Sequence, residues 1–232
     1  MEAIVIAGGF GTRLREAVPD LPKSMAPIAG RPFLEILLSS LSRKHIHRVV
    51  LSLGYLADKV IQHFGSRFAG MELTYEVEKS PLGTGGAVRL GMAACRQDHV
   101  FVFNGDTYLD LEVDAVERLW QKHHKPIIVG VDVPDTARYG RLQTDRDRMN
   151  VCGFSEKGVS GPGLINAGCY VLNRGQLDSF PLESAFSLEA DYFAKVVAKA
   201  PLDLFVTCGH FVDIGIPDDY ARAQVELGDV VC

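Results

Sequence analysis

The hydrophobic pattern in the first part of the chain alternates between short apolar runs and segments of helical period. Residues 3–7, 48–53 and 72–77 are apolar or alternating runs of strand length. Between them, apolar side chains recur at helical spacing in residues 32–44 and 57–68. This order predicts parallel strands joined by crossover helices.

The alternation continues to residue 133 and then becomes less regular. A further helix is expected to open at the glycines near residue 83 and to run to about residue 95. Later strands are expected at 99–103, 127–133, 164–172, 203–207 and 211–214, a hairpin at 140–154, and helices at 113–123, 188–198 and 217–227. Isolated late strands are often antiparallel additions to such sheets. The pattern therefore predicts an α/β fold with a Rossmann-like mixed, mostly parallel sheet sandwiched by helices.

No stretch rich in Pro, Gly or Ser divides the chain, and we expect a single domain over residues 1–232. Lys and Arg number 24 against 29 Asp and Glu, which gives a net charge of -5. A general nucleic-acid binder needs a basic excess, so no nucleic-acid partner is expected and any phosphate site must be local.

The cysteines, the N-terminal sequence and the lengths of the apolar runs indicate the cellular compartment of the protein. The chain has five cysteines and no C-x-x-C motif, which favours buried free thiols in a reducing environment. No basic segment followed by a hydrophobic core opens the sequence, and no apolar run has the length of a membrane span. We expect a cytoplasmic protein without a membrane partner.

The first apolar run stops abruptly at Gly8 and Gly9, and Gly11 follows two residues later. Glycines at a strand end let successive backbone amides turn toward an anion, and Arg13 adds a cation whose geometry suits phosphate. The working hypothesis is a nucleoside triphosphate site at the end of the first strand.

Three other interpretations of this loop are a dinucleotide-binding motif, a P-loop and an ordinary glycine turn. A dinucleotide-binding G-x-G-x-x-G motif counted from Gly9 has Leu14 where its third glycine belongs. A P-loop is excluded because no Gly-Lys-Ser or Gly-Lys-Thr occurs in the chain. An ordinary glycine turn with a solvated arginine stays open on these residues alone.

Two aspartates each end an apolar strand, Asp106 in FVFNGD and Asp213 in HFVDIG. A fold that brings these ends together offers two carboxylates with room for substrate phosphates, which is the arrangement that Mg²⁺ prefers. Each aspartate alone could equally form a turn beside glycine. Together with the glycine loop, they favour a Mg²⁺ site at Asp106 and Asp213.

Seven short motifs in a fixed order then carry a family resemblance. They are GGFGTRL at 8–14, Pro22-Lys23, LGTGGA at 82–87, NGD at 104–106, Glu156-Lys157, Asn166-Ala167-Gly168 and Asp213-Ile214-Gly215. In this order the chain resembles the sugar-1-phosphate nucleotidylyltransferases over residues 3 to about 223. The resemblance implies the nucleotide-diphospho-sugar transferase fold, Mg²⁺ as cofactor, and condensation of a nucleoside triphosphate with a sugar 1-phosphate.

Site residues follow from the positions that match the family motifs. The resemblance implies catalytic roles for Arg13, Lys23, Lys157 and Asp106. It implies nucleotide binding in the N-terminal half by Ala7, Gly8, Gly9, Gly11, Thr12, Arg13, Glu78, Gly83 and Gly85. It implies sugar-phosphate binding, mostly in the C-terminal half, by Asn104, Gly140, Glu156, Lys157, Asn166 and Gly168. Two departures stand out, since Ser24 and Ile216 replace the proline and threonine usual after Pro-Lys and Asp-Ile-Gly.

Base choice depends on Glu78. Guanine presents two adjacent donors that a carboxylate can accept together, whereas uracil and thymine suit an amide better. Glu78 therefore favours GTP, although a solvated or Lys79-paired carboxylate is the alternative. The pattern PLGTGGA further resembles guanylyltransferases of D-glycero-α-D-manno-heptose 1-phosphate, which would feed a surface polysaccharide.

Several alternatives stay open at this point. Mannose 1-phosphate guanylyl transfer and uridylyl transfer to another sugar 1-phosphate are the enzymatic ones, and a non-catalytic nucleotide-sugar-binding module is of another class. Glu189 and Asp191 could reach the far end of a large sugar, but an exposed helix face is the preferred interpretation. Apolar residues near the C-terminal helix are compatible with a homo-oligomer.

Overall fold

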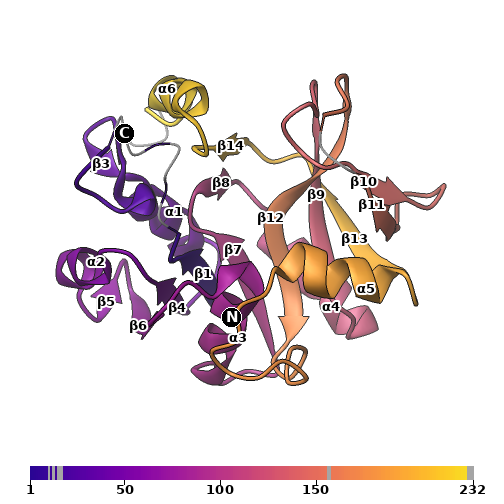
Figure 1. Ribbon diagram of the computed structural model, residues 1–232, viewed down its shortest axis with the longest axis horizontal. Coiled ribbons are helices and arrows are strands. Elements are labelled where there is room, and N and C mark those ends of the chain that lie inside the picture. The colour runs from indigo at the N-terminus through magenta and orange to yellow at the C-terminus, as the bar shows by residue number, and fades with distance from the viewer. Residues whose placement is uncertain (10, 12–13, 15–17, 156–157, 229–232) are drawn as a thin grey trace.

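The computed structural model describes residues 1–9, 11, 14, 18–155 and 158–228 (Figure 1). Its strands are β1 (Glu2–Ala7), β2 (Pro27–Ile28), β3 (Arg31–Pro32), β4 (Arg48–Leu53), β5 (Arg67–Phe68), β6 (Met71–Val77), β7 (His99–Asn104), β8 (Thr107–Leu109), β9 (Ile127–Val133), β10 (Leu142–Thr144), β11 (Asn150–Phe154), β12 (Gly163–Asn173), β13 (Leu202–Thr207) and β14 (Phe211–Asp213). Its helices are the 3-10 turn η1 (Lys23–Met25), α1 (Phe33–Ser42), α2 (Ala57–Phe64), α3 (Gly83–Ala93), α4 (Val113–His123), the π-helix η2 (Leu188–Phe193), α5 (Ala194–Val197) and α6 (Pro217–Glu226).

A ten-stranded sheet in the order β10-β11-β13-β9-β12-β7-β1-β4-β6-β5 forms the centre of the molecule. Strands β7, β1, β4 and β6 run parallel, as do β9 and β13, while β12 lies antiparallel between β7 and β9. The expected α/β fold with a mixed, mostly parallel sheet is confirmed. The late strand β12 is the expected antiparallel addition.

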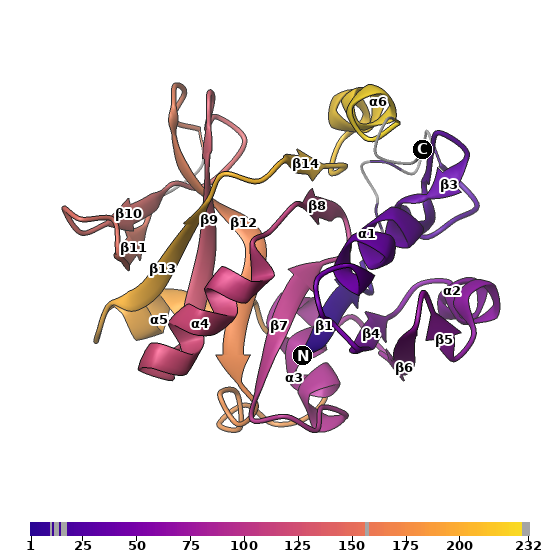
Figure 2. The same cartoon turned by 180° about the vertical axis from the view of Figure 1, so that it is seen from behind.

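Helices cover both faces of this sheet. In Figure 1, α3 and α5 lie on the viewer's side, and Figure 2 shows α1 and α4 on the opposite side. The alternation along β1 explains the two layers, because Ala3 and Val5 join one buried cluster with side chains of α1, α2 and α4, whereas Ile4 joins another with α3 and η2.

The strand register aligns the carboxyl ends of the parallel strands. Ala7 pairs with Leu53, and Leu53 pairs with Val77, so β1, β4 and β6 end at one level. Ile6 pairs with Asn104 at the end of β7. The residues that follow these strands therefore meet at one edge of the sheet, which is where α/β folds bind ligands.

A two-stranded ribbon, β8 with β14, lies beside this edge. It packs with α1 and α6 around a third apolar cluster that includes Tyr108, Val212 and Ala223. The ribbon thereby brings the C-terminal segment next to the end of β7.

Some expectations on individual elements are wrong. The helix expected over 57–68 ends at Phe64 because Gly65 takes a φ of +61°, and Arg67–Phe68 form a short strand. The expected helix at 188–198 begins as the π-helix η2 before α5. Cys95 and Cys169 are buried as expected, but Cys152 and Cys208 are exposed. Across the described residues, we find no helix whose length and apolar character would let it span a membrane.

Candidate active site

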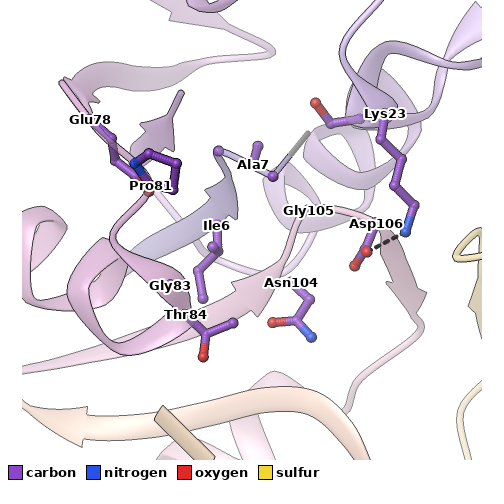
Figure 3. A pocket seen from close by; sticks show the side chains of 13 residues that line it. Ile6, Ala7, Lys23, Glu78, Pro81, Gly83, Thr84, Asn104, Gly105 and Asp106 are labelled. Carbon is purple, nitrogen blue, oxygen red and sulfur yellow. Dashed lines mark hydrogen bonds and ion pairs between the residues drawn. The ribbon is translucent and has the colours of Figure 1, made fainter. Parts of the chain in front are cut away.

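A cavity of about 280 Å³ opens at the shared edge of β1, β6 and β7 (Figure 3). Side chains and backbone from three sources line it: the ends of these strands, the turn η1 and the start of α3. The lining residues are Ile6, Ala7, Gly8, Gly9, Lys23, Ser24, Glu78, Pro81, Gly83, Thr84, Asn104, Gly105 and Asp106. Seven residues predicted to bind nucleotide or act in catalysis border this one cavity, and so does Asn104, which was predicted for the sugar phosphate. The seven are Ala7, Gly8, Gly9, Lys23, Glu78, Gly83 and Asp106.

Gly8 permits a close approach between the glycine loop and Glu78. A Cβ on Gly8 would lie 2.7 Å from Glu78 Oε1, so any larger residue would displace the carboxylate. The Leu82 amide donates to Glu78 Oε2 over 3.0 Å. Burial raises the pKa of Glu78. Glu78 is thus a fixed and partly desolvated carboxylate at one end of the cavity.

Lys79 does not pair with Glu78. Its ammonium lies 3.1 Å from Glu183 Oε1, and both side chains are exposed. The Lys79-paired interpretation of Glu78 is therefore wrong for this structure.

Lys23 stands at the other end of the cavity in Figure 3. The turn η1 holds it by two backbone hydrogen bonds, from Met25 to Pro22 over 2.7 Å and from Ala26 to Lys23 over 3.0 Å. Its Nζ lies 2.5 Å from Asp106 Oδ2, and the lysine side chain is 12% exposed. Gly11 has a φ of +58°, and a Cβ there would lie 2.7 Å from Lys23 Cβ. The glycine loop therefore passes directly over the Lys23 side chain.

Asp213 lies close to Asp106 because of the ribbon. Asp213 pairs with Thr107 in the β8–β14 register, and the Ile214 amide donates to the Asp106 carbonyl over 3.0 Å. Burial raises the pKa of Asp213, the Asp106 carboxylate raises it further, and Lys23 opposes both effects. Two neighbouring carboxylates that repel each other form a site that a cation would stabilise.

The donor set of this pair suits Mg²⁺. Both ligands are carboxylate oxygens, and Mg²⁺ sites commonly use one or two carboxylates together with waters and phosphate oxygens. Within the ranges that the structure describes, no group of three or more His, Cys, Asp or Glu gathers as a metal site. The pair would supply only part of a coordination shell.

A second cavity of about 470 Å³ lies on the C-terminal side. It is lined by Tyr139, Gly140, Phe154, Ser155, Asn166, Glu189, Ala190 and Ala194. Gly168 packs against Asn104, which lines the first cavity: its φ is +68°, and a Cβ there would lie 2.5 Å from Asn104 Nδ2. The Gly168 amide donates to Asn166 Oδ1 over 3.0 Å. Four residues predicted for the sugar phosphate, Asn104, Gly140, Asn166 and Gly168, thus lie on or between the two cavities.

Glu189 is a polar residue whose position the sequence interpretation missed. Its carboxylate accepts from Thr84 Oγ1 over 2.8 Å and from Tyr170 OH over 2.9 Å, and it lines the second cavity. Tyr170 in turn accepts from Asn166 Nδ2 over 2.8 Å. The preferred assignment of Glu189 to an exposed helix face is therefore wrong. One feature of the sequence could have located Glu189 correctly. It stands four residues before the buried Phe193, at the edge of an apolar stripe.

Gly85 has a structural environment different from that of the other predicted nucleotide-binding residues. Its amide donates to the Phe186 carbonyl over 2.9 Å, and a Cβ there would overlap the Phe186 ring. It is absent from the lining of the first cavity, whereas Gly83 borders it. Gly85 allows α3 to pack closely on the segment that precedes η2.

Four predicted residues, Thr12, Arg13, Glu156 and Lys157, lie outside the described residues. The chain on both sides of positions 156–157 is held by residues 137–141. The Ser155 amide donates to the Arg141 carbonyl over 2.9 Å, and the Gly158 amide donates to the Ala137 carbonyl over 3.0 Å. Ser155 and Gly140 also line the second cavity.

The fold is that of an α/β protein with a glycine-rich loop and two neighbouring carboxylates at the carboxyl edge of its sheet. Residues 2–229 match the family model of nucleotidyl transferases, and the chain belongs to this family. The family membership that the seven motifs predicted is confirmed.

Two relatives cover nearly the whole chain. One is a D-glycero-alpha-D-manno-heptose 1-phosphate guanylyltransferase from Aneurinibacillus thermoaerophilus, 37% identical over 231 residues that span 98% of each protein. Another protein of the same name, from Campylobacter jejuni, is 34% identical over 95% of this chain and 97% of its own. Among solved structures, HddC from Yersinia pseudotuberculosis complexed with GMP-PN aligns with a TM-score of 0.84 and 36% identity, over 96% of this chain and 97% of HddC.

Proposed function

We propose that this protein transfers a guanylyl group from GTP to D-glycero-α-D-manno-heptose 1-phosphate and releases pyrophosphate, with GDP-heptose as product. The observation that carries the proposal is the placement of Lys23, Asp106 and Asp213 together at the carboxyl edge of the sheet, with Lys23 and Asp106 in the wall of the first cavity. Similarity to two heptose 1-phosphate guanylyltransferases over almost the whole chain supports the choice of substrates.

The two cavities would bind the two substrates separately within one domain. The first, at the ends of β1, β6 and β7, would take GTP between the glycine loop and Glu78. Gly8, Gly9 and Gly11 would present backbone amides to the phosphates. The second cavity would take the sugar, with Gly140 beneath the ring and amide and carboxylate groups at its hydroxyls.

The transfer itself needs charge neutralisation and alignment, since no covalent enzyme intermediate is required. A phosphate oxygen of the sugar 1-phosphate attacks the α-phosphorus of GTP in line, and the bond from that phosphorus to the bridging oxygen of pyrophosphate breaks. Lys23 would contact the α-phosphate, Arg13 the departing pyrophosphate, and Lys157 the attacking sugar phosphate. Asp106 and Asp213 would hold Mg²⁺, which supplies positive charge to the phosphates.

Glu78 would select the base. Its carboxylate is held by the Leu82 amide at the end of the cavity opposite Lys23 (Figure 3), the position that a base takes when the phosphates lie near lysine. Guanine offers its N1 and N2 donors to such a carboxylate. The buried setting strengthens these hydrogen bonds relative to water.

A substrate matrix tests the proposal. Purified protein is incubated with GTP, UTP or dTTP and with heptose, mannose or glucose 1-phosphate, and pyrophosphate release is measured with and without Mg²⁺. We expect the highest kcat/KM with GTP and heptose 1-phosphate. A preference for mannose 1-phosphate would support the alternative guanylyltransferase, as in a relative from Mycobacterium tuberculosis that is 33% identical. No release with any pair would favour a non-catalytic binding module.

Location and assembly are part of the same proposal. GTP and sugar phosphates are cytoplasmic metabolites, so we place the reaction in the cytoplasm. Val225 on α6 is 76% exposed, and an apolar side chain at that position is compatible with a homo-oligomer.

A further inference from the structure

Ser24 follows Lys23 in the turn η1 and lines the first cavity, yet its hydroxyl has no use within the described protein. The residue is 4% exposed. Its Oγ finds no hydrogen-bond partner among the residues that the structure describes. A buried hydroxyl without a partner loses its hydrogen bonds to water and gains nothing in exchange. Such a group in the wall of a ligand cavity points to a ligand.

The turn itself does not need a serine. Its two backbone hydrogen bonds run from Met25 to Pro22 and from Ala26 to Lys23, and neither uses Ser24. The family pattern that the chain resembles has proline here, which has no hydroxyl. Lys23 is held in place in the present turn all the same. Among the described residues, none of these contacts uses the Ser24 hydroxyl, and Ser24 lines the cavity.

Its position indicates which part of GTP it would meet. Figure 3 shows Glu78 and Pro81 at one end of the cavity and Lys23 with Asp106 at the other. Ser24 adjoins Lys23 along the chain, and Gly11 lies against the Lys23 side chain. This is the end that carries the lysine ammonium and the Gly11 backbone, so a phosphate is the nearest part of the nucleotide. A serine hydroxyl is a good donor to phosphate oxygen, and rotation about one side-chain bond redirects it between staggered positions.

We propose that the Ser24 hydroxyl donates a hydrogen bond to the triphosphate of GTP, as a nucleotide-binding residue particular to this chain. The inference rests on the proposed binding of GTP in the first cavity. It predicts that the Ser24 hydroxyl contributes to affinity for the phosphates and does not stabilise the free protein.

The test compares Ser24→Ala with Ser40→Ala. Ser40, in α1, is also a buried serine, but it does not line the cavity. Affinities for GTP and for guanosine are measured by calorimetry without sugar phosphate, and melting temperatures are recorded. For Ser24→Ala we expect GTP affinity to fall roughly tenfold, the loss typical of one hydrogen bond to a charged group. Guanosine affinity should stay at the wild-type value, and the melting temperature should not fall, because the buried hydroxyl has no hydrogen-bond partner to lose among the described residues. Ser40→Ala should leave both affinities unchanged.

A second substitution guards against local unfolding of the turn. Ser24→Pro restores the residue of the family pattern and should show the same selective loss of GTP affinity. Wild-type GTP affinity in both Ser24 variants, or an equal loss for GTP and guanosine, would overturn the inference. Failure of the wild-type protein to bind GTP at all would instead overturn the proposed function.

Discussion

Lys23 Nζ lies 2.5 Å from Asp106 Oδ2, so the lysine that would contact a phosphate is paired with a carboxylate that would hold a metal. The pair joins two distant segments, since 83 positions separate the residues. The ammonium also opposes the upward shift of the pKa of Asp213. The Lys23 ammonium therefore interacts favourably with two carboxylates, Asp106 and Asp213, at the edge of the sheet. Binding of substrate or metal must change these charge interactions.

Removal of either partner of this pair should abolish most turnover. Lys23→Ala and Asp106→Asn each delete a preorganised charge, and such losses typically lower kcat about 10²–10³-fold. Pyrophosphate release measures the effect, and circular dichroism checks that the fold persists. A matched control is Asp110→Asn, which breaks the ion pair of Asp110 with Lys44 outside the first cavity. Near wild-type turnover in both variants of the central pair would contradict their assigned roles.

Two glycines of the predicted nucleotide site should respond differently to alanine. A Cβ on Gly85 would overlap the Phe186 ring, and overpacking of this kind costs about 1–3 kcal/mol of unfolding free energy. A Cβ on Gly9 meets nothing within 4 Å, but it would project where the phosphates are proposed to lie. We expect Gly85→Ala to lower the melting temperature, and Gly9→Ala to weaken GTP binding at an unchanged melting temperature.

Denaturant unfolding and calorimetric GTP titration separate the two effects. Gly85→Ala and Gly9→Ala serve as controls for each other, because each adds one methyl group to a glycine that was predicted to bind nucleotide. A Gly9→Ala variant that binds GTP as wild type does would remove the glycine loop from the phosphate site.

The regular elements were predictable because burial on both faces leaves a clear pattern. Residues 48–53, 113–123 and 127–133 form β4, α4 and β9 with the predicted bounds. The parallel topology then places Gly8, Glu78 and Asp106 at strand ends, because all carboxyl ends of such strands meet at one edge. For these three residues, sequence position and sheet topology together were sufficient to predict that they lie at one edge of the sheet.

The pairing of β8 with β14 could not be predicted in the same way. Each strand has three residues, which is too short for a periodic signal, and their pairing depends on packing against α1 and α6. Glu189 was missed because a charged residue in an amphipathic segment normally faces solvent. Here the donors Thr84 and Tyr170 satisfy its carboxylate, and such partners are invisible until the chain is folded.

Glu189→Gln should mainly affect the sugar. The carboxylate accepts hydrogen bonds from Tyr170 and Thr84, and Tyr170 accepts one from Asn166 in the wall of the second cavity. An amide offers one acceptor oxygen, so one donor loses its partner and Asn166 is less firmly held. We expect KM for the sugar 1-phosphate to rise roughly tenfold, in line with the loss of one charged hydrogen bond.

Steady-state kinetics with each substrate varied in turn checks this prediction. Glu183→Gln is the control, because Glu183 is exposed and pairs with Lys79 at the surface. An unchanged KM for the sugar phosphate, or an equal change for both substrates, would contradict a role at the second cavity.

Glu78→Gln should raise stability and lower GTP affinity at neutral pH. Burial raises the pKa of Glu78 above its ordinary value of 4.5, so the folded protein binds this proton more tightly than the unfolded chain does. The contribution of Glu78 to stability is therefore fully present below 4.5 and is lost as pH rises through the folded-state pKa. A glutamine avoids this loss and can still accept from the Leu82 amide.

The difference in unfolding free energy between Glu78→Gln and wild type, measured by urea denaturation, should thus shrink as pH falls toward 4.5. In the activity assay, the same variant should lose its preference for GTP over UTP, because an amide presents both a donor and an acceptor to the base. Glu76→Gln is the matched control, since Glu76 lies in β6, two residues before Glu78, and outside the first cavity. Stabilisation with an unchanged base preference would mean that Glu78 is a buried carboxylate of the fold and that another group selects guanine.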